Sequence, residues 1–250
     1  MEFDRIYAEV DLGRIEENME AMKEHLRPGT KMYGVVKTDA YGHGAVPVAR
    51  TIDRFVCGYA VATVDEGLKL RRHGIEKEIL CLGPVSAGRY QECLENDISL
   101  PMFEYRRAKE LSDAAVAEGK TAKIHIAVDT GMSRIGLFPD EGSVEIVKEI
   151  AELPALRIAG MFTHFARADE ADKTNAGEQY RRFREFCDDV KAAGVAVPVC
   201  HCSNSAGIVE LPDFNMDAVR AGITIYGMYP SDEVKQDIIS LKPAMALKSF

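Results

Sequence analysis

Short apolar runs alternate with longer amphipathic stretches along most of this chain. The short runs have the length and composition of buried strands, and the longer stretches repeat their apolar positions every three to four residues, as helices do. The predicted strands are Met32–Val36, Cys57–Ala62, Ile79–Leu82, Ile98–Met102, Lys123–Val128, Ile158–Thr163, Val199–Cys202 and Ala218–Gly222. Helical patterns lie between them at Gly44–Asp53, Val64–His73, Tyr105–Ala117, Gly142–Glu152 and Asn175–Ala193.

Local signals mark where some of these helices begin and end. Thr63 and Glu66 have the spacing of a capping box, which predicts a helix start directly after the second strand. Gly74, Gly119 and Gly194 stand where helices should stop. Strands that alternate with helices form parallel sheets, and eight such strands close a barrel. The pattern therefore predicts an α/β fold, a (β/α)8 TIM-like barrel, with an open doubly wound sheet as the alternative.

The two ends of the chain depart from this pattern. Phe3–Leu12 alternates like a strand, but it precedes the first βα unit and has no obvious partner in the barrel. From Ile238 onward the chain reads as extended, and Pro243 disfavours a central sheet strand there. We therefore expect a barrel over residues 1–240, and over 241–250 the start of a β-rich domain that the chain does not complete.

Composition and charge narrow the function classes. Hydrophobic residues make up 46% and charged residues 28%, as in ordinary soluble proteins. The net charge of -9 argues against nucleic acid as the main partner, because phosphate binding requires a basic patch. No apolar run approaches membrane-spanning length, and the first residues lack the basic and apolar parts of a signal peptide. A cytoplasmic location is expected.

Cysteine usage also fits a reducing compartment. The six cysteines are scattered, several of them in apolar strand-like runs. Cys200, His201 and Cys202 suggest a metal site, but a strand would send His201 to the opposite face from the two cysteines. Zinc sites also favour wider cysteine spacing and a second ligand pair elsewhere. We therefore predict that this segment binds no metal.

The residues that carry chemistry follow the ends of predicted strands. Lys37 ends the first strand in VVKTDAYGHG, and a lysine that is partly desolvated at a barrel rim suits Schiff-base chemistry. Taken alone, a solvated loop lysine is the commoner case. Other strand ends deliver further polar residues to the same rim: Arg134 in VDTGMSRIG, His164 in FTHFA, Asn204 and Ser205 in HCSNSA, and Arg220 with the Gly222–Ile223 peptide groups.

Each of these residues has an ordinary structural explanation. His164 could be a satisfied core histidine, Arg134 and Arg220 could be ion-pair partners, and Tyr41 could be a packed loop aromatic. The convergence of five separate motifs at one rim makes these explanations untenable together. A lysine, a phosphate cradle built from Ser205 and backbone N–H groups, and an arginine between them fit pyridoxal phosphate.

With these motifs in place, the chain resembles the N-terminal barrel of bacterial alanine racemases from about Tyr7 to Lys248. The matching segments are VVKTDAYGHG, VDTGMSRIG, FTHFA, HCSNSA and RAGITIYGMYPS. The resemblance implies pyridoxal-phosphate-dependent interconversion of L-alanine and D-alanine by two bases. It implies that Lys37 holds the cofactor covalently and acts as one of the two bases.

The resemblance also implies roles for the other residues at the rim. Tyr41, Ser205 and the amides of Gly222 and Ile223 would bind the phosphate, and Asn204 would line the phosphate pocket. Arg220 would face the pyridine nitrogen, and His164 would lie beside the ring. Arg134 would contact the phenolic oxygen of the cofactor and the carboxylate region of the substrate.

Two departures from the family pattern matter. The second base of the family is a tyrosine of the C-terminal domain, contributed across a homodimer interface, and this chain ends before it. The isolated chain is therefore expected to be nearly inactive. Many relatives also carry a carbamylated lysine where this sequence has Ala127, so another group, such as an anion, must hold Arg134.

Two other functions stay open, although the first of them shares the barrel and the lysine but not the AYGHG and GMSRIG contexts. One is a free-standing pyridoxal-phosphate-binding barrel of the homeostasis type, which lacks a racemase half. The other is the racemase domain of a serine racemase, because substrate choice depends largely on residues beyond Phe250. The reading frame past Phe250 would distinguish these functions.

Overall fold

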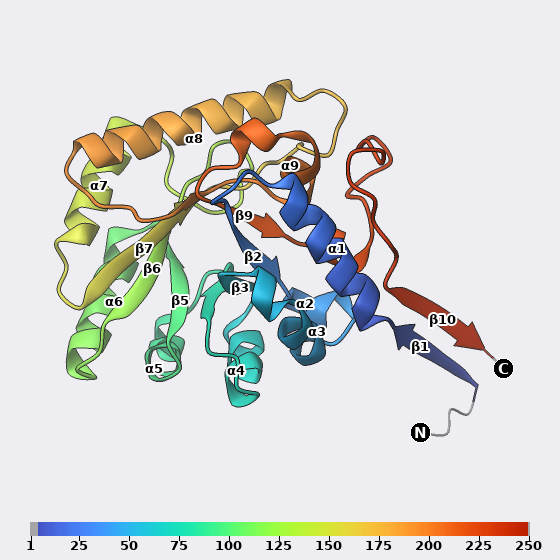
Figure 1. Ribbon diagram of the computed structural model, residues 1–250. Helices are drawn as coiled ribbons and strands as arrows, with labels where there is room; N and C mark the ends of the chain where they lie inside the picture. The colour runs from blue at the N-terminus through green and yellow to red at the C-terminus, as the bar shows by residue number, and fades with distance from the viewer. Residues whose placement is uncertain (1–4, 250) are drawn as a thin grey trace.

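The computed structural model describes residues 5–249, and its centre is a closed barrel of eight parallel strands (Figure 1). The strands follow chain order from β2 to β9, and β9 pairs back onto β2. They are β2 Lys31–Val35, β3 Gly58–Val61, β4 Glu78–Cys81, β5 Ile98–Met102, β6 Ala122–Ala127, β7 Leu156–Phe162, β8 Cys200–His201 and β9 Ala218–Ala221. The predicted barrel and its eight strands are confirmed, and the open sheet is excluded.

Helices surround the barrel, and the longer ones bury one apolar face against it. They are α1 Leu12–His25, α2 Lys37–Tyr41, α3 Ala45–Ile52, α4 Val64–Arg72, α5 Tyr90–Glu95, α6 Tyr105–Ala117, α7 Glu141–Ala151, α8 Thr174–Ala192 and α9 Ser205–Glu210. The buried side chains of α8, such as Phe183 and Phe186, show this packing. The five predicted helical patterns agree with α3, α4, α6, α7 and α8 to within one residue at each end.

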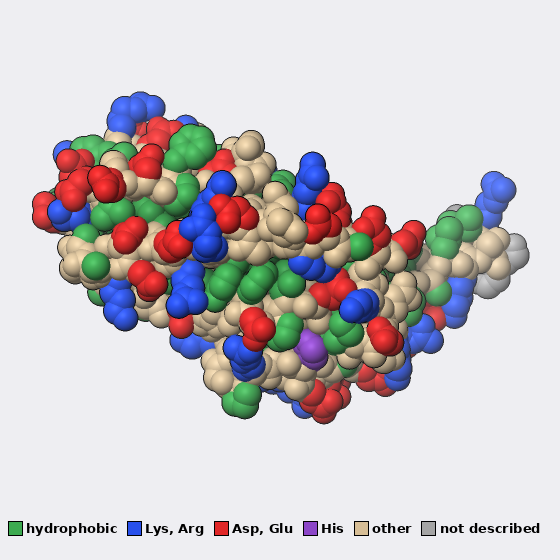
Figure 2. All heavy atoms as spheres, turned by 90° about the horizontal axis from the view of Figure 1, so that it is seen from above, with side chains coloured by type: hydrophobic (Ala, Val, Ile, Leu, Met, Phe, Trp, Pro, Cys, Tyr) green, Lys and Arg blue, Asp and Glu red, His purple; other side chains and the backbone are tan. Residues whose placement is uncertain are grey.

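Both ends of the described chain meet outside the barrel. β1 (Ile6–Val10) pairs antiparallel with β10 (Met245–Ser249), and this two-stranded arm projects from the body of the molecule (Figure 1 and Figure 2). The strand predicted at Phe3–Leu12 is confirmed for Ile6–Val10, whereas Phe3 lies outside the described residues. Its partner, which the sequence pattern did not identify, is the extended segment that follows Pro243.

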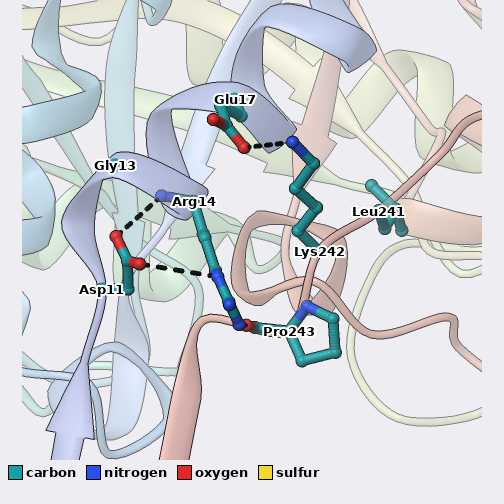
Figure 3. A pocket seen from close by; sticks show the side chains of 7 residues that line it. All are labelled: Asp11, Gly13, Arg14, Glu17, Leu241, Lys242 and Pro243. Carbon is teal, nitrogen blue, oxygen red and sulfur yellow. Dashed lines mark hydrogen bonds and ion pairs between the residues drawn. The ribbon is translucent and has the colours of Figure 1, made fainter.

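α1 holds the segment that follows the barrel, around Lys242, through hydrogen bonds. The side chain of Asn18, 1% exposed, donates to Lys242 O at 2.9 Å and accepts from Lys242 N at 2.7 Å. A surface hollow here is lined by charged groups of α1 and residues 241–243 (Figure 3). Its charges are paired internally, since Lys242 Nζ lies 2.7 Å from Glu17 and Arg14 Nε lies 3.5 Å from Asp11, and Arg14 also donates to Pro243 O at 2.8 Å. These contacts connect α1 to residues 241–243, so we assign the hollow a structural role.

The capping box of α4 also supports the turn that carries Lys37. Glu66 Oε2 accepts from the backbone N–H groups of Ala62 and Thr63, at 2.7 and 3.2 Å. Its other oxygen, Oε1, accepts from Thr38 N at 2.6 Å. The predicted capping box is confirmed, and one carboxylate connects a helix start to the residue after Lys37.

Replacing Glu66 with alanine should lower the free energy of unfolding by about 1–2 kcal/mol, because the backbone donors at both sites lose their acceptor. Chemical denaturation monitored by circular dichroism measures this change. Glu76→Ala, at an exposed position, is the control and should change stability by less than about 0.5 kcal/mol. Equal effects of the two substitutions would contradict the double role of Glu66.

Candidate active site

A cavity of about 530 Å³ opens at the carboxyl ends of the barrel strands. All of the residues that the sequence singled out line it: Lys37, Tyr41, Arg134, His164, Asn204, Ser205, Arg220, Gly222 and Ile223. They come from segments far apart in the chain, and the closed barrel brings them together. The structure therefore places the predicted residues in one site, and their individual roles stay predictions.

Lys37 follows β2 and opens an unusual turn. Thr38, Asp39, Ala40 and Tyr41 all have positive φ between 51° and 55°, which forms one turn of left-handed helix. Such backbone costs free energy for residues with a side chain, so the surrounding structure must enforce it. Glu66 holds the N–H of Thr38, and Asp39 accepts from Ala45 N at 2.9 Å. The carboxylates of Glu66 and Asp39 thus stabilise the left-handed turn that carries Tyr41.

This turn sets the positions of Lys37 and Tyr41 relative to each other. The ammonium group of Lys37 lies 5.8 Å from the centre of the Tyr41 ring. The Tyr41 ring in turn packs against that of Tyr226, whose hydroxyl donates to Val35 O at 2.9 Å. Burial raises the pKa of Tyr41, so its hydroxyl stays protonated and can donate a hydrogen bond.

Hydroxyl and backbone N–H groups converge at the other side of the cavity. Ser205 Oγ accepts from the N–H of Gly222 at 3.0 Å and from that of Thr224 at 3.4 Å. A Cβ on Gly222 would lie 3.3 Å from the Tyr41 hydroxyl and 3.5 Å from Ser205 Oγ. The missing side chain thus leaves a cradle between these hydroxyl groups. Asn204 supports it from outside, because its Oδ1 caps α9 through Gly207 N at 3.1 Å.

Arg220 is 3% exposed, and its terminal nitrogens are fully engaged. Nη1 donates to Nδ1 and O of His201, at 2.8 and 3.1 Å. Nη2 contacts Thr163 O at 2.8 Å, Cys202 O at 2.9 Å and His164 Nδ1 at 3.2 Å. The Nε–H group has no acceptor among residues 5–249, so it is the donor left for a ligand in the cavity.

His164 is a neutral imidazole at physiological pH. Burial, followed by the positive charges of Arg220, Arg134 and Lys37, lowers the pKa of His164 to about 3. Its Nδ1 lone pair therefore remains available to Arg220 Nη2. A neutral ring beside the cavity adds no charge to the site.

Arg134 lies at the rim of the cavity and is exposed. Its loop is ordered by Asp129, whose Oδ1 accepts from the N–H groups of Gly131 and Ser133 at 3.0 and 2.9 Å. The guanidinium of Arg134 forms no hydrogen bond or ion pair within the described part of the chain. Ala127 is 1% exposed on β6 and supplies no charged partner, so the prediction that another group holds Arg134 remains open.

The net charge of the cavity lining is opposite in sign to the net charge of the chain. Its charged lining consists of three cationic side chains and one carboxylate, Lys37, Arg134, Arg220 and Asp169, because Tyr41 and His164 are neutral. The chain as a whole carries a net charge of -9, and acidic and basic side chains are interspersed over the face in Figure 2. A local positive potential in an acidic protein favours a small anionic ligand.

Sequence reasoning missed a group of polar residues inside the barrel beneath the cavity. They are Tyr33, Glu78, Ser99, His125 and His201, which hydrogen bond to one another. A signal was present, because histidines in otherwise apolar strands are unusual in a barrel core. His201 was considered only as a possible metal ligand, and it instead contacts Arg220.

Residues 5–249 contain no group of three or more His, Cys, Asp or Glu side chains arranged to hold a metal ion. Over the same range, no helix is long and apolar enough to cross a membrane.

The chain matches known proteins over most of its length. The family model described as "Alanine racemase, N-terminal domain" matches residues 10–230. Alanine racemases from Clostridium tetani and Clostridium novyi are 40% and 44% identical over 245 residues, which is 98% of this chain and 63% of each relative. The chain therefore spans less than two thirds of their length.

Solved structures show the same likeness. Alanine racemase from Clostridium difficile superposes with a TM-score of 0.96 at 39% identity, covering 98% of this chain and 64% of that one. Alanine racemase from Bacillus anthracis with bound L-Ala-P superposes with a TM-score of 0.90 at 37% identity, covering 99% and 64%.

The lowered pKa of His164 predicts a loss of stability in acid. Between pH ~6.5 and about 3 the unfolded chain binds a proton at His164 that the folded chain excludes, so the free energy of unfolding falls as pH falls. His164→Asn should flatten this dependence by roughly 1 kcal/mol per pH unit. Urea denaturation at several pH values measures how the free energy of unfolding changes with pH. Above pH ~7.5 this free energy should change with pH equally in the variant and in the wild-type protein. Identical slopes in acid would contradict the buried neutral state of His164.

Proposed function

Because this chain belongs to the alanine racemase family, we propose that it is the cofactor-binding domain of a pyridoxal-phosphate-dependent enzyme that interconverts L-alanine and D-alanine. One observation carries the proposal. Lys37 shares a positively lined cavity with the cradle formed by Tyr41, Ser205 and Gly222. That combination offers both a nucleophilic amine and a phosphate site to one small ligand.

The residues present fit pyridoxal phosphate. The amine of Lys37 would hold it covalently, and the Tyr41 and Ser205 hydroxyls with the Gly222 and Ile223 amides would hold its phosphate. The space that a Cβ on Gly222 would fill is the observation that supports this fit. Bound in this way, the cofactor withdraws electrons from the substrate Cα, which makes the Cα proton removable.

Arg220 sets the electronic character of the site. Its Nε–H group is the free donor at the cavity and would face the nitrogen of the pyridine ring. Burial lowers the pKa of Arg220 to about 10, so the guanidinium still keeps its proton near neutral pH. A donor that does not surrender its proton leaves the ring nitrogen unprotonated. Arg220 would in this way make the bound ring a weaker electron sink and limit side reactions such as transamination.

The proton chemistry falls to Lys37 on one face of the substrate. Its amine would remove or return the Cα proton on that face, and inversion requires a second base on the other face. His164 would lie beside the ring as a neutral hydrogen-bonding group and support the second base. Arg134, exposed at the rim, would bind the phenolic oxygen of the cofactor and the substrate carboxylate.

The remainder of the enzyme follows from this assignment. We propose that residues 1–240 form the cofactor-binding domain and that 241–250 begin a second, β-rich domain. The last barrel strand ends at Ala221 and β10 lies outside the closed barrel, which supports a boundary near residue 240. The second base would come from that second domain of a partner subunit, so the full-length protein would act as a homodimer.

Lys37 should be the attachment site of pyridoxal phosphate. Incubation with the cofactor, reduction with borohydride and peptide mapping should place the label on Lys37 alone. Lys37→Ala should still bind phosphate at the cradle but lose the label and the absorption of the linked cofactor. Lys31→Ala, at the opposite end of β2, is the matched control and should label normally. A label on another lysine would exclude the assignment.

The chain of 250 residues should show at most trace racemase activity, because Lys37 serves only one face of the substrate. With pyridoxal phosphate and D-alanine in heavy water, it should exchange the Cα proton slowly and retain configuration. Chiral chromatography with mass spectrometry measures both outcomes, and Lys37→Ala should abolish the exchange. Rapid formation of L-alanine would show that residues 1–250 contain a second base.

A further inference from the structure

A chain of polar side chains runs through the interior of the barrel, away from the cavity. Arg220 Nη1 lies 2.8 Å from His201 Nδ1, and His201 Nε2 lies 3.1 Å from His125 Nδ1. His125 Nε2 lies 3.2 Å from Glu78 Oε1. Strands β4, β6 and β8 are not neighbours in the sheet, so these contacts must cross the barrel interior.

Only one arrangement of protons satisfies this chain. A guanidinium can only donate, so His201 Nδ1 must accept, and a neutral His201 then carries its proton on Nε2. That proton faces His125 Nδ1, which must also accept, and His125 therefore carries its proton on Nε2. The last donor requires an acceptor, and the carboxylate of Glu78 supplies it. Every proton thus points from the cavity toward Glu78.

Glu78 is built to act as this acceptor. Besides His125, it accepts from the Tyr33 hydroxyl at 2.7 Å and from the Ser99 hydroxyl at 2.8 Å. Burial alone would raise the pKa of Glu78, but the hydrogen bonds that it accepts from His125, Tyr33 and Ser99 lower the pKa below its ordinary value. The group is therefore ionised at neutral pH.

Two glycines make room for the chain of rings. A Cβ on Gly160 would lie 2.5 Å from His125 Nδ1, and one on Gly58 would lie 2.8 Å from Glu78 O and 3.0 Å from the Tyr33 ring. The pairing of β6 with β7 also shifts register between Ile124 and His125. The backbone is thus adapted to these side chains at three places.

We propose that Glu78 is a positioning residue for Arg220, acting through His125 and His201 from the far end of the barrel. It fixes both imidazoles as Nε2–H tautomers, which keeps His201 Nδ1 as an acceptor for Arg220 and leaves Arg220 Nε–H directed at the cavity. The inference rests on the proposed role of Arg220 toward the pyridine ring.

The tautomers can be read without any cofactor. In the ¹⁵N-histidine-labelled chain, long-range ¹H–¹⁵N spectra should show His125 and His201 as neutral rings protonated on Nε2. A proton on Nδ1 of His201, or a doubly protonated ring at neutral pH, would overturn the proposal. In Glu78→Leu the Nε2–H signal of His125 should shift, and the Nε2–H signal of His201 should shift as well.

Cofactor binding gives the second readout. Glu78→Leu should weaken the affinity for pyridoxal phosphate on the order of tenfold, because Arg220 is no longer held in place. Glu78→Gln keeps an acceptor oxygen and should restore both the ring signals and most of the affinity. Ser112→Ala removes a buried hydroxyl that donates to Pro154 O at 2.6 Å, outside this chain of side chains, and is the matched control, with both readouts unchanged.

Different results test the role of Glu78 and the attachment of the cofactor at Lys37. If Glu78→Leu does not fold, His125→Phe breaks the next link with a ring of similar size and should weaken binding to a similar degree. Wild-type ring signals and wild-type affinity in the folded variant would overturn the role of Glu78. Absence of labelling at Lys37 in the wild-type chain would instead overturn the proposed function, and the ring signals would still test Glu78.

Discussion

The burial of one permanent positive charge, the guanidinium of Arg220, governs the interior of this barrel. A buried ion is tolerated only when its hydrogen-bonding groups are satisfied. Arg220 meets this requirement with three backbone carbonyls and two imidazole nitrogens around Nη1 and Nη2. The carbonyls come from the ends of β7 and β8, so the charge also fixes how those strands end beneath the cavity.

The same constraint explains why the barrel core is not uniformly apolar. TIM barrels usually fill their interior with layers of branched aliphatic side chains. Here imidazoles, hydroxyls and a carboxylate replace part of that filling, and Gly58 and Gly160 provide the space they need. Around this polar column the packing remains apolar, with buried residues such as Ile79, Ile124 and Met161. The barrel is therefore stabilised by hydrogen bonds among the polar side chains in its interior and by apolar packing around them.

Sequence reasoning recovered the barrel because buried parallel strands and amphipathic helices leave strong periodic signals. It also predicted that Lys37, Ser205 and Arg220 lie at one rim, because the carboxyl ends of parallel strands in a barrel lie at the same end of the barrel. It could not find the link from Arg220 to Glu78, because pairing across the barrel interior depends on strand tilt and register. The left-handed turn at Thr38–Tyr41 was also missed, because none of its residues is glycine and only contacts such as that with Glu66 reveal it.

The pairing of β1 with β10 has a consequence for how the chain acquires its structure during synthesis. Each βα unit of the barrel can form from neighbouring residues as they leave the ribosome. β1 precedes all of the barrel strands, yet its partner lies at residues 245–249, so Ile6 and Val10 stay unpaired until the whole barrel has been made. The closing contact between β2 and β9 is similarly late. Contacts of such long sequence separation form slowly, so β1 is made before the barrel strands but becomes ordered after them.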